Sequence, residues 1–140
     1  MDISFYSEEV LMPDFNRNVV VEWIRQAIQS ENKDTGDCSI IFCSDKYLLE
    51  INKKYLNHDY FTDIVAFDYG ENNIVSGDLF ISVDRVKDNA AYYDVDVNQE
   101  LHRVMIHGIM HLCGYKDSNE SEQKQMREKE NHYLKMGGLM

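Results

Sequence analysis

The stretch His107–Asp117 has the sequence HGIMHLCGYKD and combines a helix pattern with three groups that can bind a metal. His107 and His111 are four residues apart, and residues at this spacing share one helix face with Cβ atoms about 5–6 Å apart. Two imidazoles at that distance can bind one zinc ion, because Zn–N bonds are about 2.0–2.1 Å long. Gly114 can adopt a positive φ that ends the helix, so that Asp117 returns to the same point as a third ligand. The spacing H-x-x-x-H-x-x-G-x-x-D therefore predicts a zinc site with one position open for water or substrate.

The two histidines lie outside the apolar face of the helix predicted over residues 97–114. At about 100° per residue, the apolar face comprises Leu101, Met105, Ile109 and Leu112, whereas the histidine pair shares a separate face with Glu100 and Val104. His102 points in another direction. Two helical histidines alone more often serve packing or hydrogen bonding, but the glycine turn and the returning carboxylate favour metal binding.

Gly108 distinguishes this motif from the zinc-peptidase motif H-E-x-x-H, in which the glutamate is the general base. A peptidase with Gly108 at that position would lack its base, which disfavours this activity. Gly108 faces the packed side of the helix, where a small residue allows a strand to approach closely. Cys113 is rotated about 200° from His111, so we expect it to pack in the core.

The composition is that of a folded globular protein. The 140 residues are 44% hydrophobic with one Pro and seven Gly, which predicts one domain over residues 1–140 without a long linker. The first residues lack the pattern of a signal peptide, and no apolar run reaches the roughly 18–20 residues that cross a bilayer. We therefore expect a cytoplasmic protein without membrane contact. Its three cysteines, Cys38, Cys43 and Cys113, should then be reduced and mostly buried.

The strongly acidic charge opposes long-range attraction to nucleic acids. The net charge is −11, and such a field slows association with a polyanion. A local basic patch can still dominate at contact, and the best candidate comprises Lys46, Lys53, Lys54 and His58. A solvated helix face is the commoner role of such a group.

The apolar periodicities predict an α+β fold. Expected strands lie around Ile3, Phe5 and Val10, over 38–43, over 64–69 and over 74–83, with turns at 33–37 and 70–73. The first expected helix begins at Pro13-Asp14 and ends near Ser30. The second begins at Asp45, which caps it, and directs Leu48, Ile51 and Tyr55 inward. Three further helices are expected over residues 84–94, 97–114 and 120–136. Strands that mostly precede helices predict a mixed four-stranded sheet covered by helices, with a zincin-like metal helix.

Four sequence elements resemble the YbeY family of metal-dependent rRNA maturation factors. The family carries H-G-x-x-H-L-x-G-Y-D-H, N-x-x-Y-R, T-D/N-V-L-S-F and G-D-I-x-I-S, and the chain has HGIMHLCGYKD at 107–117, NKKY at 52–55, TDIVAF at 62–67 and GDLFIS at 77–82. The resemblance implies a single-domain α+β fold and one zinc ion on the motif residues. It also implies endoribonuclease activity in small-subunit rRNA maturation and ribosome quality control. The implied partners are ribosomal RNA, the small ribosomal subunit and ribosome-associated proteins.

The chain departs from the family pattern at two positions. Asp117 replaces the third histidine, which leaves a competent zinc ligand but adds a negative charge that weakens the Lewis acid. Leu56 replaces the arginine after the tyrosine, so a bidentate phosphate contact is lost. The candidates to replace that arginine are Lys53, Lys54 and His58.

Two aspartates are candidates for a catalytic or metal-supporting role. Asp63 follows a threonine at a strand entry, where capping a turn is the ordinary role. Asp78 follows a glycine in a predicted strand, which indicates a bulge. Either carboxylate is a candidate base or outer partner of the metal.

Three functions are consistent with these observations. The leading hypothesis is a zinc-dependent endoribonuclease with His107, His111 and Asp117 as ligands. The second is a non-catalytic, ribosome-associated adaptor in which a structural metal stabilises the Gly114 turn, which the acidic charge favours. The third is a peptidase or another zinc metallohydrolase. The ligand set also suits Ni²⁺, Co²⁺ or Fe²⁺.

Overall fold

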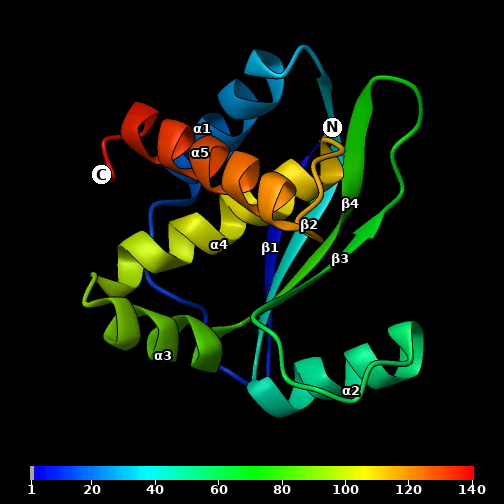
Figure 1. The fold of residues 1–140 in the computed structure, drawn as a ribbon, viewed down its shortest axis with the longest axis vertical. Coiled ribbons are helices and arrows are strands. Elements are labelled where there is room, and N and C mark those ends of the chain that lie inside the picture. Colours follow the sequence, from blue (N-terminus) through cyan, green and yellow to red (C-terminus); the bar gives the residue numbers. More distant parts are fainter. Residues whose placement is uncertain (1) are drawn as a thin grey trace.

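The computed structural model describes residues 2–140, which form a four-stranded sheet and five helices. The strands are β1 (Ile3–Glu8), β2 (Asp34–Cys43), β3 (Ile64–Asp68) and β4 (Ile74–Ser82), and the helices are α1 (Arg17–Ser30), α2 (Asp45–Leu56), α3 (Val83–Tyr93), α4 (Val97–Leu112) and α5 (Glu120–Met136). The sheet order is β1-β2-β4-β3 (Figure 1). β1, β2 and β4 are parallel, whereas β3 is antiparallel to β4. The predicted α+β fold with a mixed four-stranded sheet is confirmed.

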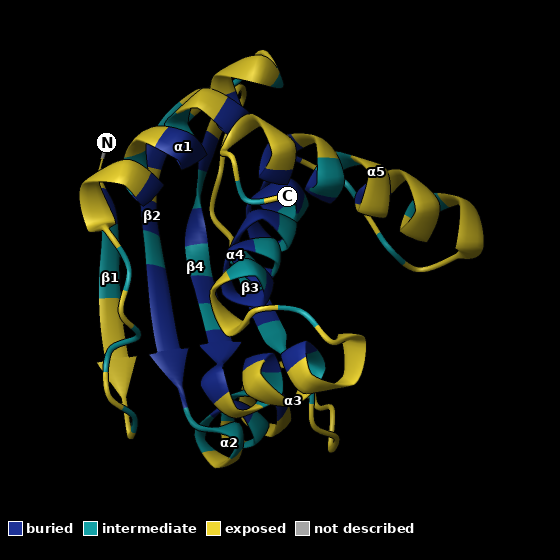
Figure 2. Ribbon diagram, turned by 90° about the vertical axis from the view of Figure 1, so that its left-hand side faces the viewer, coloured by how far each residue is buried: buried dark blue, intermediate teal, exposed yellow. Residues whose placement is uncertain are grey.

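The main hydrophobic core lies between the sheet and the helices α1 and α4. Strands β2 and β4 are buried along most of their length, whereas the edge strand β1 is exposed over its second half (Figure 2). The core includes Trp23 and Ile24 from α1, Leu79 from β4 and Met105 and Ile109 from α4. A smaller cluster on the opposite face joins Leu48 of α2 to Val65 of β3 and their neighbours. Within residues 2–140, no helix is both long and apolar enough to span a membrane.

Gly108 allows α4 to lie close to the sheet, as its position in the motif predicts. A Cβ atom at Gly108 would lie only 2.6 Å from Ile64 Cδ1 of β3 and 2.8 Å from Leu79 Cδ1 of β4. Any larger residue would push the helix away from these strands. This contact places the histidine face of α4 beside the start of β3.

The N-terminal elements begin and end differently from the prediction. Glu9 has a φ of 63° and follows the end of β1, so Val10 lies outside the strand. α1 begins at Arg17 and not at Pro13-Asp14, because the Asn16 side chain accepts a hydrogen bond from the Val19 backbone N–H and caps the helix. Asn and Asp are both good caps, and the sequence did not distinguish Asn16 from Asp14.

The turn predicted over residues 33–37 was wrong, because β2 already begins at Asp34. The Asp34 N–H donates to the Asn73 carbonyl at 2.9 Å. A Cβ atom on Gly36 would lie 2.9 Å from the Val75 carbonyl oxygen, so this glycine marks close packing of strands. The irregular register lies between Thr35 and Cys38, and not at Asp78 where a bulge was expected.

Helix α2 is capped by Ser44 and not by Asp45. The Ser44 hydroxyl accepts from the Tyr47 N–H. Leu48 is buried as expected, but Tyr55 is 57% exposed while the polar Asn52 is 1% exposed. The Tyr55 ring contacts the edge strand β3, where it lies edge-on to Phe67 with ring centroids 5.8 Å apart.

The three cysteines are free thiols buried in the core, as predicted. Burial raises the pKa of Cys38 to about 11 and those of Cys43 and Cys113 to about 12. The thiols are therefore protonated at neutral pH. A protonated thiol is a poor metal ligand, which supports a packing role for Cys113.

Candidate metal centre

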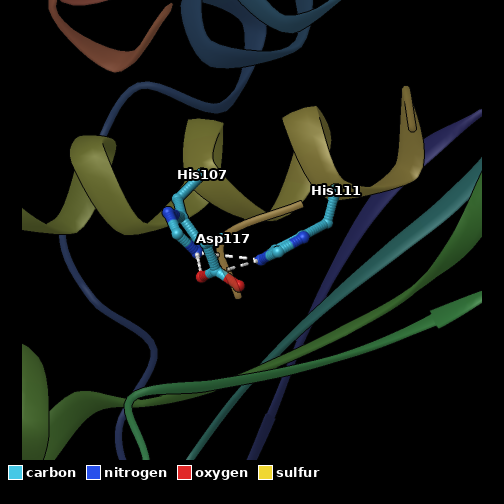
Figure 3. Close-up of side chains that lie close together, drawn as sticks. All are labelled: His107, His111 and Asp117. Atoms are coloured by element: carbon cyan, nitrogen blue, oxygen red, sulfur yellow. Dashed lines mark hydrogen bonds and ion pairs between the residues drawn. The ribbon is translucent and has the colours of Figure 1, made fainter. Parts of the chain in front are cut away.

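His107, His111 and Asp117 bring three ligand atoms together beneath α4 (Figure 3). The His107 Nε2 atom lies 3.0 Å from His111 Nε2 and 3.2 Å from Asp117 Oδ2. His111 Nε2 lies 3.4 Å from the same Asp117 oxygen. A tetrahedral ion with bonds of about 2.0–2.1 Å holds neighbouring ligand atoms about 3.3 Å apart. The three distances therefore fit one face of a tetrahedral metal site.

The second nitrogen of each imidazole is hydrogen-bonded to an acceptor. His107 Nδ1 lies 2.7 Å from the Glu130 carboxylate, and His111 Nδ1 lies 3.0 Å from the Tyr115 carbonyl oxygen. Because these acceptors need a proton on Nδ1, each neutral ring presents the lone pair of its Nε2 atom to the other ring. Two lone pairs and a carboxylate at these distances repel one another, and either a proton shared between the two Nε2 atoms or a metal ion offsets this repulsion. The donor set is therefore compatible with a metal ion.

The turn after α4 returns Asp117 to the two histidines. Gly114 has a φ of 106°, a conformation that side chains other than glycine rarely adopt. The Tyr115 N–H donates to the Met110 carbonyl at 3.0 Å, which closes the turn and aims the Tyr115 carbonyl at His111. The role predicted for Gly114 follows from this geometry.

A buried carboxylate at the end of α1 stabilises the Gly114 turn. Glu31, which follows α1, accepts a hydrogen bond of 2.5 Å from the Tyr115 hydroxyl and another from the Tyr133 hydroxyl, and it pairs with Lys129 at 3.0 Å. Burial acts to raise the pKa of Glu31, but these three donors outweigh it and lower the pKa below its ordinary value of 4.5. Glu31 therefore ties α1, the Gly114 turn and α5 together.

Glu31→Gln should destabilise the fold at neutral pH by about 2 kcal/mol, the range of hydrogen bonds to a charged group. Because the pKa of Glu31 is lowered by folding, its charge stabilises the fold above the ordinary pKa, and this contribution disappears as the pH falls through the folded value. Urea unfolding at pH 7 and at about pH 3.5 should show a smaller difference from wild type at the acidic pH. Glu22→Gln, at an exposed position of α1, is the matched control. An equal loss at both pH values would exclude the charge as the cause.

Glu130 of α5 is the residue of this site that sequence analysis missed. Its side chain is 7% exposed and pairs with Arg103 at 3.0 Å and Arg127 at 3.4 Å besides His107. Burial acts to raise the pKa of Glu130, but the contact with His107 and the two arginines lower it overall. Burial likewise acts to lower the pKa of His107, and Glu130 reverses this and raises it. A signal was present, because Glu130 shares the buried stripe of α5 with Met126, Tyr133 and Leu134.

Comparisons with known proteins place this site in a family. The family model described as Endoribonuclease YbeY matches residues 2–138. The chain belongs to the YbeY family. It is 49% identical to Endoribonuclease YbeY of Parabacteroides distasonis over 134 residues, which cover 96% of this chain and 94% of that protein. It is 46% identical to Endoribonuclease YbeY of Bacteroides thetaiotaomicron over 136 residues, which cover 97% and 99%. The resemblance drawn from the four motifs is confirmed.

A solved structure has the same fold. The solution structure of TM1509 from Thermotoga maritima superposes with a TM-score of 0.68 at 24% identity, covering 97% of this chain and 89% of that one. At this identity the likeness concerns the fold alone.

The metal trio lies on the wall of an open pocket of about 400 Å³. The residues that line this pocket come from α2, the loop between α2 and β3, β3, α4 and the turn at Asp117. Asp63 is one of the lining residues. Burial raises the pKa of Asp63, and the neighbouring His107 only partly offsets this effect. The structure thus brings Asp63 beside the metal trio.

Asp78 lies on the other face of the sheet. A Cβ atom on its neighbour Gly77 would meet Leu112 of α4 at 2.8 Å, and Leu79 reaches Gly108 of the same helix. Because successive side chains of a strand alternate between faces, Asp78 points away from α4. Its carboxylate lies near Tyr69 and helps to raise the pKa of that hydroxyl. The structure therefore separates Asp78 from the metal trio.

The three candidates for phosphate binding, Lys53, Lys54 and His58, also occupy different positions relative to the metal trio. His58 lines the pocket together with Leu56, which stands where the YbeY family has arginine. Lys53 pairs with Glu50 at 3.8 Å and with Asp59 at 3.5 Å. Lys54 lies over the Tyr55 ring and lines a different pocket. Of these three, the structure places His58 at the metal pocket.

Proposed function

We propose that this chain cuts RNA with one zinc ion held by His107, His111 and Asp117, and that it acts in the maturation and quality control of small-subunit ribosomal RNA. The observation that carries the proposal is the tetrahedral spacing of the three ligand atoms at 3.0–3.4 Å in a member of the endoribonuclease YbeY family. Residues 1–140 would act as one domain, which the continuous core between the sheet, α1 and α4 supports. Because small-subunit ribosomal RNA is assembled into ribosomes in the cytoplasm, an enzyme that acts on it would be cytoplasmic.

The side chains around the trio would prepare it for phosphodiester cleavage. A zinc ion at this position supplies a Lewis acid for a phosphoryl oxygen and lowers the pKa of a bound water. Glu130 and the Tyr115 carbonyl keep both imidazoles in the tautomer that presents Nε2. Asp63, on the wall of the same pocket, is the candidate to accept or return a proton. Asp117 contributes a negative charge where the family has a neutral histidine, so we expect a milder Lewis acid.

The deciding measurement is the metal content of untagged, purified protein by mass spectrometry, alongside Asp117→Ala. We expect about one zinc ion per wild-type chain, and a loosened or lost ion in the variant because one of three ligands is gone. Asp117→His restores the family residue and should bind zinc again. RNA cleavage should follow the zinc content of the three proteins. Absence of metal from wild type after zinc is added back would contradict the proposal.

An adaptor function is the second candidate, and the charge of the chain favours it. The net charge of −11 suits basic protein partners, such as ribosomal proteins, better than bare RNA. Cells that lack the protein should accumulate unprocessed rRNA ends. A His107→Ala copy should fail to rescue them if the chain is a nuclease, and should rescue them if it is an adaptor.

A further inference from the structure

Two aromatic rings form a stacked pair beside the metal trio. The loop between α2 and β3 carries His58 and Tyr60, whose ring centroids lie 5.1 Å apart with an interplanar angle of 19°. The Tyr60 hydroxyl lies 3.0 Å from His58 Nδ1. Both residues line the pocket that contains His107 and His111, and Tyr60 is 53% exposed. Solvent-exposed rings at a candidate active site can bind a planar ligand by stacking.

A buried side chain fixes the loop that carries these rings. Asn52 of α2 is 1% exposed, and its Nδ2 atom donates to the Tyr60 carbonyl at 3.0 Å. The carbonyl of the same Asn52 accepts from the His58 N–H at 3.1 Å. Asn57 has a φ of 55° and reverses the chain between them. One residue thus holds the loop backbone at both ring-bearing positions, which reduces the entropy cost of binding a ligand there.

The pocket offers little for a phosphate group apart from the metal trio. Within residues 2–140, its lining includes Asp63, Asp68 and Asp117 but no lysine or arginine. Lys53, one turn before the loop, pairs with Asp59 at 3.5 Å. An RNA chain would therefore gain little from ionic contacts with protein side chains here. Attachment has to come from another part of the nucleotide.

We propose that the His58–Tyr60 pair stacks on an unpaired nucleobase of single-stranded RNA and thereby presents the adjoining phosphodiester to the metal trio. The inference rests on the proposed nuclease function and assigns His58 and Tyr60 as the residues that contact the base. Aromatic side chains stack on splayed bases, and this contact needs no basic residue. Bases inside an A-form duplex are covered on both faces by their neighbours, so a duplex cannot use the pair. The platform replaces the phosphate contact that Leu56 cannot make.

The neighbouring Phe61 provides a matched control. It is 52% exposed and belongs to the same loop, but its ring lies 5.0 Å from the Arg85 guanidinium, and it is absent from the pocket lining. Phe61→Leu should therefore leave RNA binding unchanged. Tyr60→Phe keeps the ring and removes the hydroxyl, whereas Tyr60→Ala removes the stacking surface.

The test measures binding of a single-stranded oligoadenylate decamer that is fully 2′-O-methylated and carries one 2-aminopurine. Tyr60→Ala should weaken binding by about 10-fold, within the range of losses on removing one stacked base. It should also abolish the fluorescence quenching that stacking causes. Tyr60→Phe and Phe61→Leu should bind and quench like wild type. The same strand annealed to its complement should bind wild type about 10-fold more weakly or worse.

Control measurements separate this inference from the proposed function. Zinc content and thermal unfolding should be the same in wild type and all variants, since Tyr60 is exposed and touches none of the ligands. Normal binding and quenching by Tyr60→Ala, or equal binding of the duplex, would overturn the platform while zinc-dependent cleavage by wild type still stood. Zinc-loaded wild type that neither binds nor cuts RNA would overturn both.

Discussion

His111→Ala is expected to lose the bound metal and with it all RNA cleavage, while the protein stays folded. The substitution removes one of three atoms that face one another at 3.0–3.4 Å. Partners that only orient a ligand already contribute about 10–100-fold to metal affinity, so loss of the ligand itself should exceed about 100-fold. The His111 side chain is 26% exposed, and the core face of α4 is untouched. Metal titration, cleavage assays and circular dichroism give the three readouts.

A histidine outside the site is the control for this experiment. His132 lies on the exposed side of α5, and His132→Ala should keep both the metal and the activity. Metal-free His111→Ala that cut RNA at the wild-type rate would remove the metal from the mechanism. Loss of cleavage with full retention of the metal would instead assign His111 a role in substrate contact.

The metal trio could be predicted from sequence because its geometry is local. His107 and His111 are related by one helical turn, and the glycine turn needs only three further residues to return Asp117. Glu130 and Glu31 could not be predicted in this way. They reach the site from positions 23 residues after His107 and 84 residues before Tyr115. Only the packing of α1 and α5 around α4 brings them there.

The wrong turn at residues 33–37 and the positions of Lys53 and Asp78 have a similar origin. Gly36 was assigned to a turn because glycine is common in turns, whereas here it accommodates the Val75 carbonyl of a strand that follows much later. Lys53 was a phosphate candidate by its charge alone, and the pairing with Asp59 depends on how the loop folds back onto α2. Asp78 was a candidate alongside Asp63 because each lies in a motif that resembles the family. Asp63 precedes β3 and lines the pocket, whereas the pleat of β4 turns Asp78 away from α4.

The second large effect is expected for Glu130→Gln, which should lower both metal affinity and stability. The glutamine can still accept from His107 Nδ1, but the charge that holds Arg103 and the imidazole is gone. Metal affinity should fall about 10–100-fold. Because removing one member of a buried ion pair leaves the other uncompensated, stability should fall by about 3 kcal/mol. Calorimetric metal titration and urea unfolding measure the two effects separately.

A variant of the partner arginine separates positioning of the ligand from simple destabilisation. Arg103 is 13% exposed and contacts Glu130 Oε1, while His107 contacts Oε2. Arg103→Met should therefore cost stability comparable to Glu130→Gln yet retain most of the metal affinity, since the contact with His107 remains. Glu128→Gln, at an exposed position of the same helix, should change neither quantity. If Arg103→Met lost the metal as strongly as Glu130→Gln, the carboxylate would act through general stability and not by orienting His107.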